Sequence, residues 1–74
     1  MNQNDMILNH IMKYGSITPR EALELYAVMR LGARVYDLRR MGYIIKKETV
    51  KATNRFGEPV HFAKYTMGKK EMMQ

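Results

Sequence analysis

The stretch from Ser16 to Gly42, SITPREALELYAVMRLGARVYDLRRMG, decides the fold of this 74-residue chain. It opens with the pattern of a helix start: Thr18 is a preferred N-cap residue, and Pro19 fits the first helical turn. Glu21 completes a capping box with Thr18. We therefore expect a helix that begins within two residues of Thr18. The residues on or near its expected apolar side are Leu23, Leu25 and Tyr26.

A second helix follows after a break near Tyr26 to Met29, and it is rich in arginine. The residues at helical spacing that we expect to face the core are Leu31, Val35 and Leu38. Gly42 comes next as a typical C-terminal stop. Two short helices joined by a tight turn have the layout of a helix-turn-helix, whose second helix usually enters the major groove of DNA.

Shorter elements are expected before this unit. Asn4 or Asp5 can start a helix that runs to about Tyr14 and ends at Gly15. The predicted inward stripe of this helix consists of Ile7, Leu8, Ile11 and Met12. The dipeptide 16–17 can then form a minimal strand before the Thr18 cap.

Two segments rich in β-branched and aromatic residues follow, from Tyr43 to about Ala52 and from Val60 to Met67. The turn-rich loop 53–59 lies between them, so the two segments read as a β-hairpin. Three helices followed by a basic hairpin predict a mainly α fold with a small β-hairpin, a three-helix winged helix-turn-helix. We expect one domain over residues 1–67 and a flexible tail over 68–74.

The composition argues against several classes of function. The chain has no cysteine, which excludes disulfides and thiolate metal sites. His10 and His61 lie far apart in the sequence, without a carboxylate cluster at metal-ligand spacing, and no nucleophile elbow or phosphate-binding glycine loop is present. We expect no enzyme activity, cofactor, metal or small-molecule ligand. The eight methionines are expected to be mostly core residues. The polar N-terminus and the lack of a long apolar run predict a cytoplasmic protein without membrane contact.

The chain has a formal net charge of +6, and its positive charge is concentrated from residue 30 onward. Residues 1–29 carry two basic and three acidic side chains, whereas residues 30–40 carry four arginines and a single aspartate. Residues 41–64 add five basic side chains against two acidic ones. A surface adjusted only for solubility would more often mix its signs. This asymmetry favours a nucleic-acid face, and a recognition helix favours double-stranded DNA as the partner.

Three stretches of the chain resemble the small winged-helix domains common among bacteriophage and prophage proteins. They are ITPREALELY at 17–26, RLGARVYDLR at 30–39 and GYII at 42–45. The resemblance is close over roughly half of the chain and looser in the hairpin. It implies a winged-helix fold and DNA binding, and it does not identify a DNA target.

The predicted DNA-contacting residues lie on the outer face and borders of the helix over 28–41, and on the hairpin. They are Arg30, Ala33, Arg34, Tyr36, Arg39, Arg40, Lys51, Asn54 and Arg55. An arginine fork can bond O6 and N7 of guanine together or clamp a phosphate. Arg30 and Arg40 have the strongest case, because both project outward or flank the outer face.

Alternatives stay open for several of these residues. Asp37 is three residues from both Arg34 and Arg40, so it either orients an arginine or contacts DNA. Arg39 either contacts a phosphate or is solvated, and Tyr36 either contacts DNA or packs locally.

Two functions remain open from the sequence. The first is a DNA-binding module that acts as a small phage-type transcriptional regulator or as an accessory factor in recombination or replication. The second is a protein-interaction module, an adaptor or inhibitor that docks on another protein. A single recognition helix with one wing covers a short site, so useful specificity calls for a homodimer or a larger protein partner.

Overall fold

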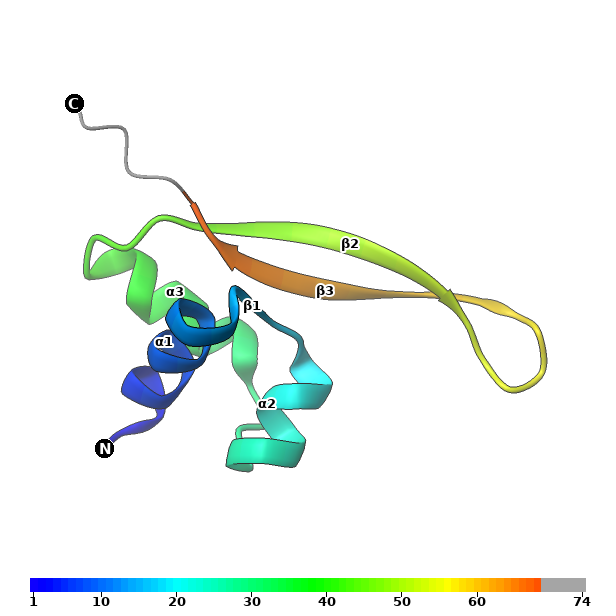
Figure 1. Cartoon of the computed structure of the whole chain (residues 1–74), viewed down its shortest axis with the longest axis horizontal. Coiled ribbons are helices and arrows are strands. Elements are labelled where there is room, and N and C mark those ends of the chain that lie inside the picture. The colour runs from blue at the N-terminus through cyan, green and yellow to red at the C-terminus, as the bar shows by residue number, and fades with distance from the viewer. Residues whose placement is uncertain (69–74) are drawn as a thin grey trace.

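The computed structural model describes residues 1–68, which form three helices and a three-stranded antiparallel sheet (Figure 1). The elements in chain order are α1 (Gln3–Tyr14), β1 (Ser16–Ile17), α2 (Pro19–Tyr26), α3 (Leu31–Arg40), β2 (Ile45–Thr53) and β3 (Pro59–Met67). The strand order is β1-β3-β2. No helix among these residues is long and apolar enough to cross a membrane.

Helix α1 is capped by Asn2, and the expectation of a start at Asn4 or Asp5 was wrong by one to two residues. The side chain of Asn2 accepts a hydrogen bond from the Asp5 amide at 2.8 Å, which is N-cap geometry. At the other end Gly15 adopts a left-handed φ of +93°, and its N–H donates to the Ile11 carbonyl, so the predicted stop is confirmed.

The core-facing side of α1 differs in part from the predicted stripe. Ile7 and Ile11 are buried, but Met12 is 67% exposed. His10 is buried in its place, and its Nδ1 lies 2.6 Å from the Tyr26 hydroxyl, with which it shares a hydrogen bond. Positions 7, 10 and 11 fall on one side of a helix, whereas position 12 is turned about 100° from position 11. The buried histidine is therefore satisfied by α2.

Helix α2 begins as its sequence predicts. The Glu21 amide donates to Thr18 Oγ1 at 3.2 Å, and the Thr18 amide donates to Glu21 Oε1 at 2.9 Å, which confirms the capping box. The expected apolar side was wrong for Leu23 and Leu25, which are half or more exposed, and Tyr26 packs against the core as expected. An eight-residue helix turns a narrow side to the core, and α2 makes that contact through the buried Ala22 and the partly buried Tyr26.

Helix α3 supplies the centre of the core. Leu31, Val35 and Leu38 are all at most 3% exposed, as predicted. The other buried apolar residues are Ile7, Ile11, Ile17, Ala22, Val28, Ile45 and Tyr65. The core is thus built mainly from branched aliphatic residues. The expectation that the methionines lie mostly in the core does not hold for Met12 and Met41, which are exposed; Met29 is exposed as well, and its helical spacing had already placed it on the outer face of α3.

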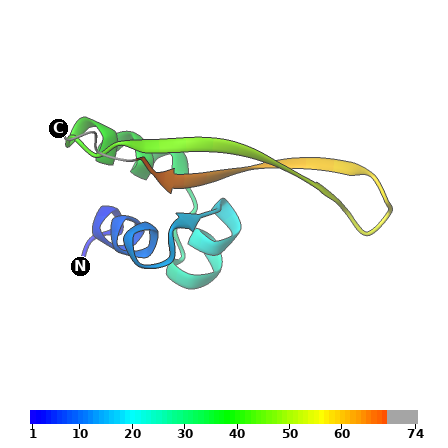
Figure 2. The same cartoon turned by 45° about the horizontal axis from the view of Figure 1, so that its top comes forward.

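The sheet is larger than the small hairpin predicted. Strands β2 and β3 are nine residues each and pair without a break from Ile45↔Met67 to Thr53↔Pro59. The short strand β1 pairs with the other edge of β3 at its base. From that base the hairpin projects well beyond the helices (Figures 1 and 2). At about 3.3 Å per residue, the strands carry the hairpin tip about 26 Å from the base.

Gly68, which the prediction places in the flexible tail, takes part in the fold. Gly68 is buried, and its N–H donates to the Ile44 carbonyl at 2.7 Å. It therefore belongs to the folded part of the chain. The rest of the expected flexible tail, residues 69–74, lies outside the described residues.

Candidate nucleic-acid interface

One side of α3 faces the sheet and is occupied by structural contacts. A Cβ added at Gly32 would lie 3.9 Å from the Tyr65 hydroxyl, so a small residue suits this position. Arg39 lies on the same side, where its Nε and Nη2 both donate to the Ile45 carbonyl, at 3.1 and 2.8 Å. This bifurcated contact ties the last turn of α3 to the first residue of β2. Arg39 was expected to contact a phosphate or be solvated, and the structure gives it an intramolecular partner.

Replacing Arg39 with alanine should therefore affect folding more than DNA recognition. A hydrogen bond from a charged donor contributes about 1.5–3 kcal/mol, and solvent exposure of this side chain reduces that to about 1 kcal/mol. We expect Arg39→Ala to lower the free energy of unfolding by this amount in urea titrations. Arg39→Lys is the matched control for charge. Unchanged stability together with weakened DNA binding would instead assign Arg39 to DNA.

A second side of α3 faces α1. Arg34 Nη2 lies 3.2 Å from Asp37 Oδ2, and the same carboxylate oxygen accepts a hydrogen bond from Asn4 Nδ2 at 3.5 Å. Asp37 was expected either to orient an arginine or to contact DNA, and the structure shows it paired with Arg34. The Arg34 side chain is 30% exposed, and its Nε is buried without a partner among the described residues. Arg34 is therefore held at the helix junction and is only partly accessible.

The third side of α3 faces solvent and carries the accessible predicted residues. Tyr36 is 60% exposed, and the Arg40 guanidinium lies 5.8 Å from the centre of its ring. Ala33 lies between Tyr36 and the helix start and is half-buried. Arg30 is the N-cap residue of α3, is exposed, and makes no side-chain capping bond.

Arg30 and Arg40 lie at the two ends of α3: Arg40 is on this outer side, and Arg30 flanks it, turned about 80° around the helix axis. Within residues 1–68 neither makes an ion pair or a side-chain hydrogen bond. Ten residues at 1.5 Å each place their backbones about 15 Å apart along the helix. Two exposed guanidinium groups thus lie at opposite ends of α3, and the Arg40 group also lies over the Tyr36 ring.

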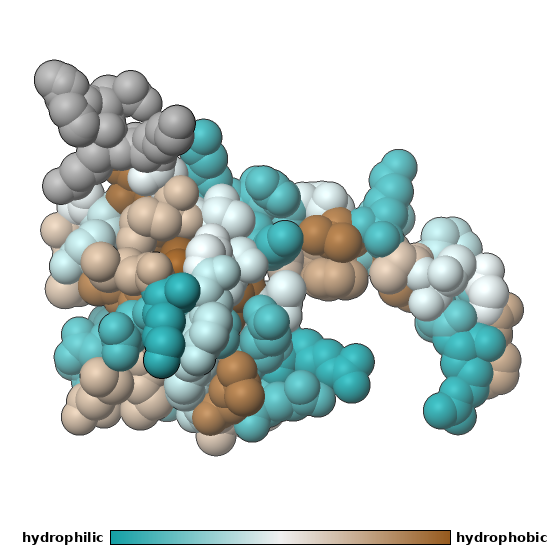
Figure 3. All heavy atoms as spheres, in the orientation of Figure 1, coloured by the Kyte–Doolittle hydropathy of each residue, from teal (hydrophilic) through white to brown (hydrophobic). Residues whose placement is uncertain are grey.

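Beyond its base the hairpin has two chemically different faces, because side chains alternate along each strand. One face carries Lys51 directly opposite His61, with Lys47 and Thr49 on the same side. The other face carries the apolar cross-strand pairs Val50↔Phe62 and Ala52↔Val60. At the base the pattern differs, since the Lys51 side also carries the buried Ile45 and Tyr65. Apolar side chains are visible on the part of the hairpin that lies beyond the helices (Figure 3).

Lys47 belongs, with Lys46, Lys51 and Lys64, to the hairpin lysines that the sequence offers as contacts to the DNA backbone. His61 was not among the predicted contacts, and the signal that could have placed it beside Lys51 is the strand register. That register depends on the turn that joins the strands.

Asn54 shapes the hairpin tip. Its Oδ1 accepts hydrogen bonds from the amides of Phe56 at 2.9 Å and Glu58 at 3.0 Å, and its Nδ2 donates to Glu58 Oε1 at 3.1 Å. Gly57 adopts a left-handed φ of +79° that favours glycine. Asn54 was predicted to contact DNA, and its side chain is engaged in the turn. Arg55 beside it is exposed and forms no ion pair within residues 1–68.

The nine predicted contacts therefore divide into two groups. The residues with free, exposed or half-exposed side chains are Arg30, Ala33, Tyr36 and Arg40 on α3, and Lys51 and Arg55 on the hairpin. The residues with intramolecular partners are Arg34, Arg39 and Asn54. In the part of the chain that the structure describes, no group of three or more histidines, cysteines or carboxylates could hold a metal ion.

Comparison with known families agrees with this arrangement. A family model described as a winged helix-turn-helix domain matches residues 2–70 of the chain. Neither the curated proteins nor the solved structures contained a match. The family match spans all three helices and the whole hairpin, and domains of this architecture bind DNA through the second helix of the helix-turn-helix. The chain belongs to the winged helix-turn-helix domain family.

Proposed function

We propose that this protein binds duplex DNA sequence-specifically, with the outer side of α3 in the major groove and the basic hairpin on the flanking backbone. The observation that carries this proposal is the pair of exposed guanidinium groups, Arg40 on the solvent side of α3 and Arg30 beside it, neither of which forms an ion pair or a side-chain hydrogen bond within residues 1–68. Arginine forks of this kind bind guanine edges or phosphates. The biological role we propose is that of a small phage-type transcriptional regulator or an accessory factor in recombination or replication.

The start of α3 supports this placement. Arg30 caps the helix without a side-chain hydrogen bond, so the first amides of α3 keep no side-chain partner from the N-cap. Backbone N–H groups at a helix N-terminus suit phosphate oxygens. A DNA backbone could therefore approach this end of the helix closely.

Selection of bound duplexes from a random pool, followed by salt titration on the selected site, tests the proposal. Release of counterions predicts that the logarithm of the affinity falls linearly with the logarithm of salt concentration. A sequence consensus with a steep salt slope would support the proposal. The absence of any enriched sequence would overturn specific recognition.

The wing gives a separate prediction at Arg55, which is exposed at the hairpin tip. The base of the hairpin lies next to the end of α3, and Arg55 lies about 26 Å from that base. Because this distance takes Arg55 away from the groove that α3 occupies, we expect it to contact phosphate or the minor groove. Arg55→Ala should weaken binding to related and unrelated duplexes by similar factors, and lower the magnitude of the salt slope by about one. Electrophoretic mobility shifts over a range of salt concentrations measure both.

Lys13→Ala is the control for this measurement, because it also removes one exposed positive charge but lies in the last turn of α1. We expect it to leave the salt slope nearly unchanged. A selective loss at one base position in Arg55→Ala would show that the wing reads sequence. An unchanged slope would show that Arg55 is only solvated.

A second candidate function, a protein-interaction module, is favoured by the apolar face of the hairpin. Val50, Ala52, Val60 and Phe62 form a continuous cluster there, and Val60 and Phe62 remain more than a third exposed. An apolar surface of this kind can mark a protein-binding site, including one for a second copy of the chain. Salt separates the two functions, because an apolar contact does not show the steep loss of affinity that counterion release produces.

A further inference from the structure

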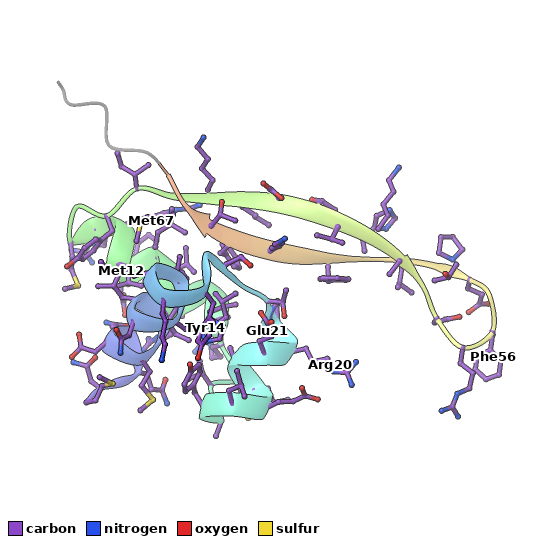
Figure 4. All side chains as sticks on the ribbon, in the orientation of Figure 1. Met12, Tyr14, Arg20, Glu21, Phe56 and Met67 are labelled. Atoms are coloured by element: carbon purple, nitrogen blue, oxygen red, sulfur yellow. The ribbon has the colours of Figure 1, made fainter. Side chains whose placement is uncertain are left out.

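Phe56 is the most exposed aromatic residue at the hairpin tip. Its relative exposure is 83%, and its side chain lies at the end of the hairpin far from the helices (Figure 4). It makes no contribution to the core and does not fold back onto it. The fold itself therefore gives no reason for an aromatic ring at this position.

The turn fixes the backbone that carries this ring. The Phe56 amide donates to Asn54 Oδ1, and the backbone closes around it through hydrogen bonds from Asn54 N to Glu58 O and from Gly57 N to Asn54 O. The side chain of Asn54 also bonds Glu58 at two points. A tip with this many internal hydrogen bonds loses little conformational freedom when it binds a partner.

The tip carries charges of both signs near the ring. Arg55 directly precedes Phe56, Glu58 follows it in the same turn, and Lys51 lies on β2 nearer the base. An aromatic ring beside a guanidinium suits a nucleic acid, because the cation pairs with phosphate while the ring stacks on a base. The reach of the hairpin, about 26 Å, is shorter than one helical turn of DNA at about 34–36 Å. The tip can therefore meet the groove adjacent to the one that α3 occupies.

We propose that Phe56 is a wedge that enters the minor groove and stacks between two adjacent bases of the bound duplex. This inference rests on the proposed function and goes beyond it, because it predicts local distortion of the DNA at a step that α3 does not contact. Apolar side chains that enter the minor groove partially unstack base steps and kink the duplex. Pyrimidine–purine steps unstack most easily, so the selected sites should favour them at the position of the tip.

Duplexes with 2-aminopurine at successive positions of the selected site test the wedge, because the fluorescence of this base rises when it unstacks. We expect wild-type protein to raise the fluorescence at one step on the hairpin side of the site. Phe56→Ala should abolish that rise and weaken binding by about 5- to 150-fold, the range for loss of one aromatic–base stack. Its melting temperature should equal that of wild type, because the ring is outside the core.

Phe56→Leu and Arg55→Ala complete the design. Leucine keeps an apolar wedge without an aromatic face, so it should retain part of the fluorescence rise. Arg55→Ala should weaken binding but keep the rise, because it removes charge and leaves the ring.

The outcomes separate this inference from the proposed function. Phe56→Ala that binds the selected duplex with wild-type affinity would overturn the wedge and leave DNA recognition by α3 intact. Insertion would also be overturned if Phe56→Ala binds more weakly but the wild-type protein raises the 2-aminopurine fluorescence at no position. Failure of the wild-type protein to select any duplex would overturn both, and would leave a protein pocket as the partner of the ring.

Discussion

Leu38→Ala should lower the free energy of unfolding by about 2–5 kcal/mol, the range for buried leucines. Leu38 is fully buried on the core side of α3. The total stability of a domain this size is about 4–11 kcal/mol, at roughly 0.05–0.15 kcal/mol per residue. The substitution therefore removes a large share of it. We expect a melting temperature lower by about 10 °C or more, measured by circular dichroism.

Leu25→Ala is the matched control for Leu38→Ala. It makes the same chemical change in the neighbouring helix, at a position that is 59% exposed. We expect a change within about 0.5 kcal/mol, as for other surface substitutions. Equal destabilisation by the two variants would contradict the burial pattern of α2 and α3.

Local signals in the sequence were enough to predict the helix-turn-helix. The capping box of Thr18 and Glu21 involves atoms only three residues apart, so it forms wherever the helix forms. Leu31, Val35 and Leu38 occur at helical spacing, which identifies a buried side without knowledge of what covers it.

Contacts between elements were harder to predict. Met12 belongs to an apolar run, but its exposure depends on how α1 rotates against α3 and β1. The two hydrogen bonds of Arg39 depend on where β2 begins, and the sequence pattern predicted a start two residues earlier than Ile45. The helical spacing of α3 gives the direction of the Arg39 side chain, but it does not predict that the Ile45 carbonyl of β2 lies there to accept its hydrogen bonds.

The role of Asn54 was within reach of the sequence. In a tight turn, the side chain of an asparagine commonly accepts a hydrogen bond from the backbone amide two residues further along the chain. The segment Asn54 to Gly57 has this pattern, and the structure shows the corresponding bond to Phe56. The prediction that Asn54 contacts DNA gave too little weight to this hydrogen bond within the turn. Arg55 has no such partner in the turn, and its side chain is exposed at the tip.

Replacing both Arg30 and Arg40 with alanine should produce the largest loss of specific DNA binding. A bidentate contact from arginine to a base is worth about 1–3 kcal/mol of discrimination. The two residues lie about 15 Å apart along α3, beyond the distance at which substitutions usually interact. Their effects should therefore add to about 2–6 kcal/mol, and fluorescence anisotropy with the selected duplex and an unrelated duplex measures the difference.

Lysine variants separate geometry from charge at these two positions. Arg30→Lys and Arg40→Lys keep the positive charge but lose the planar fork, so they should retain non-specific binding and lose discrimination. Lys13→Ala again controls for net charge, since it lies outside α3. Both arginines are exposed, so the double variant should remain folded, which circular dichroism verifies. A folded double variant that binds the selected site as tightly as wild type would rule out α3 as the recognition helix. Loss of binding with full rescue by lysine would place both residues on phosphates.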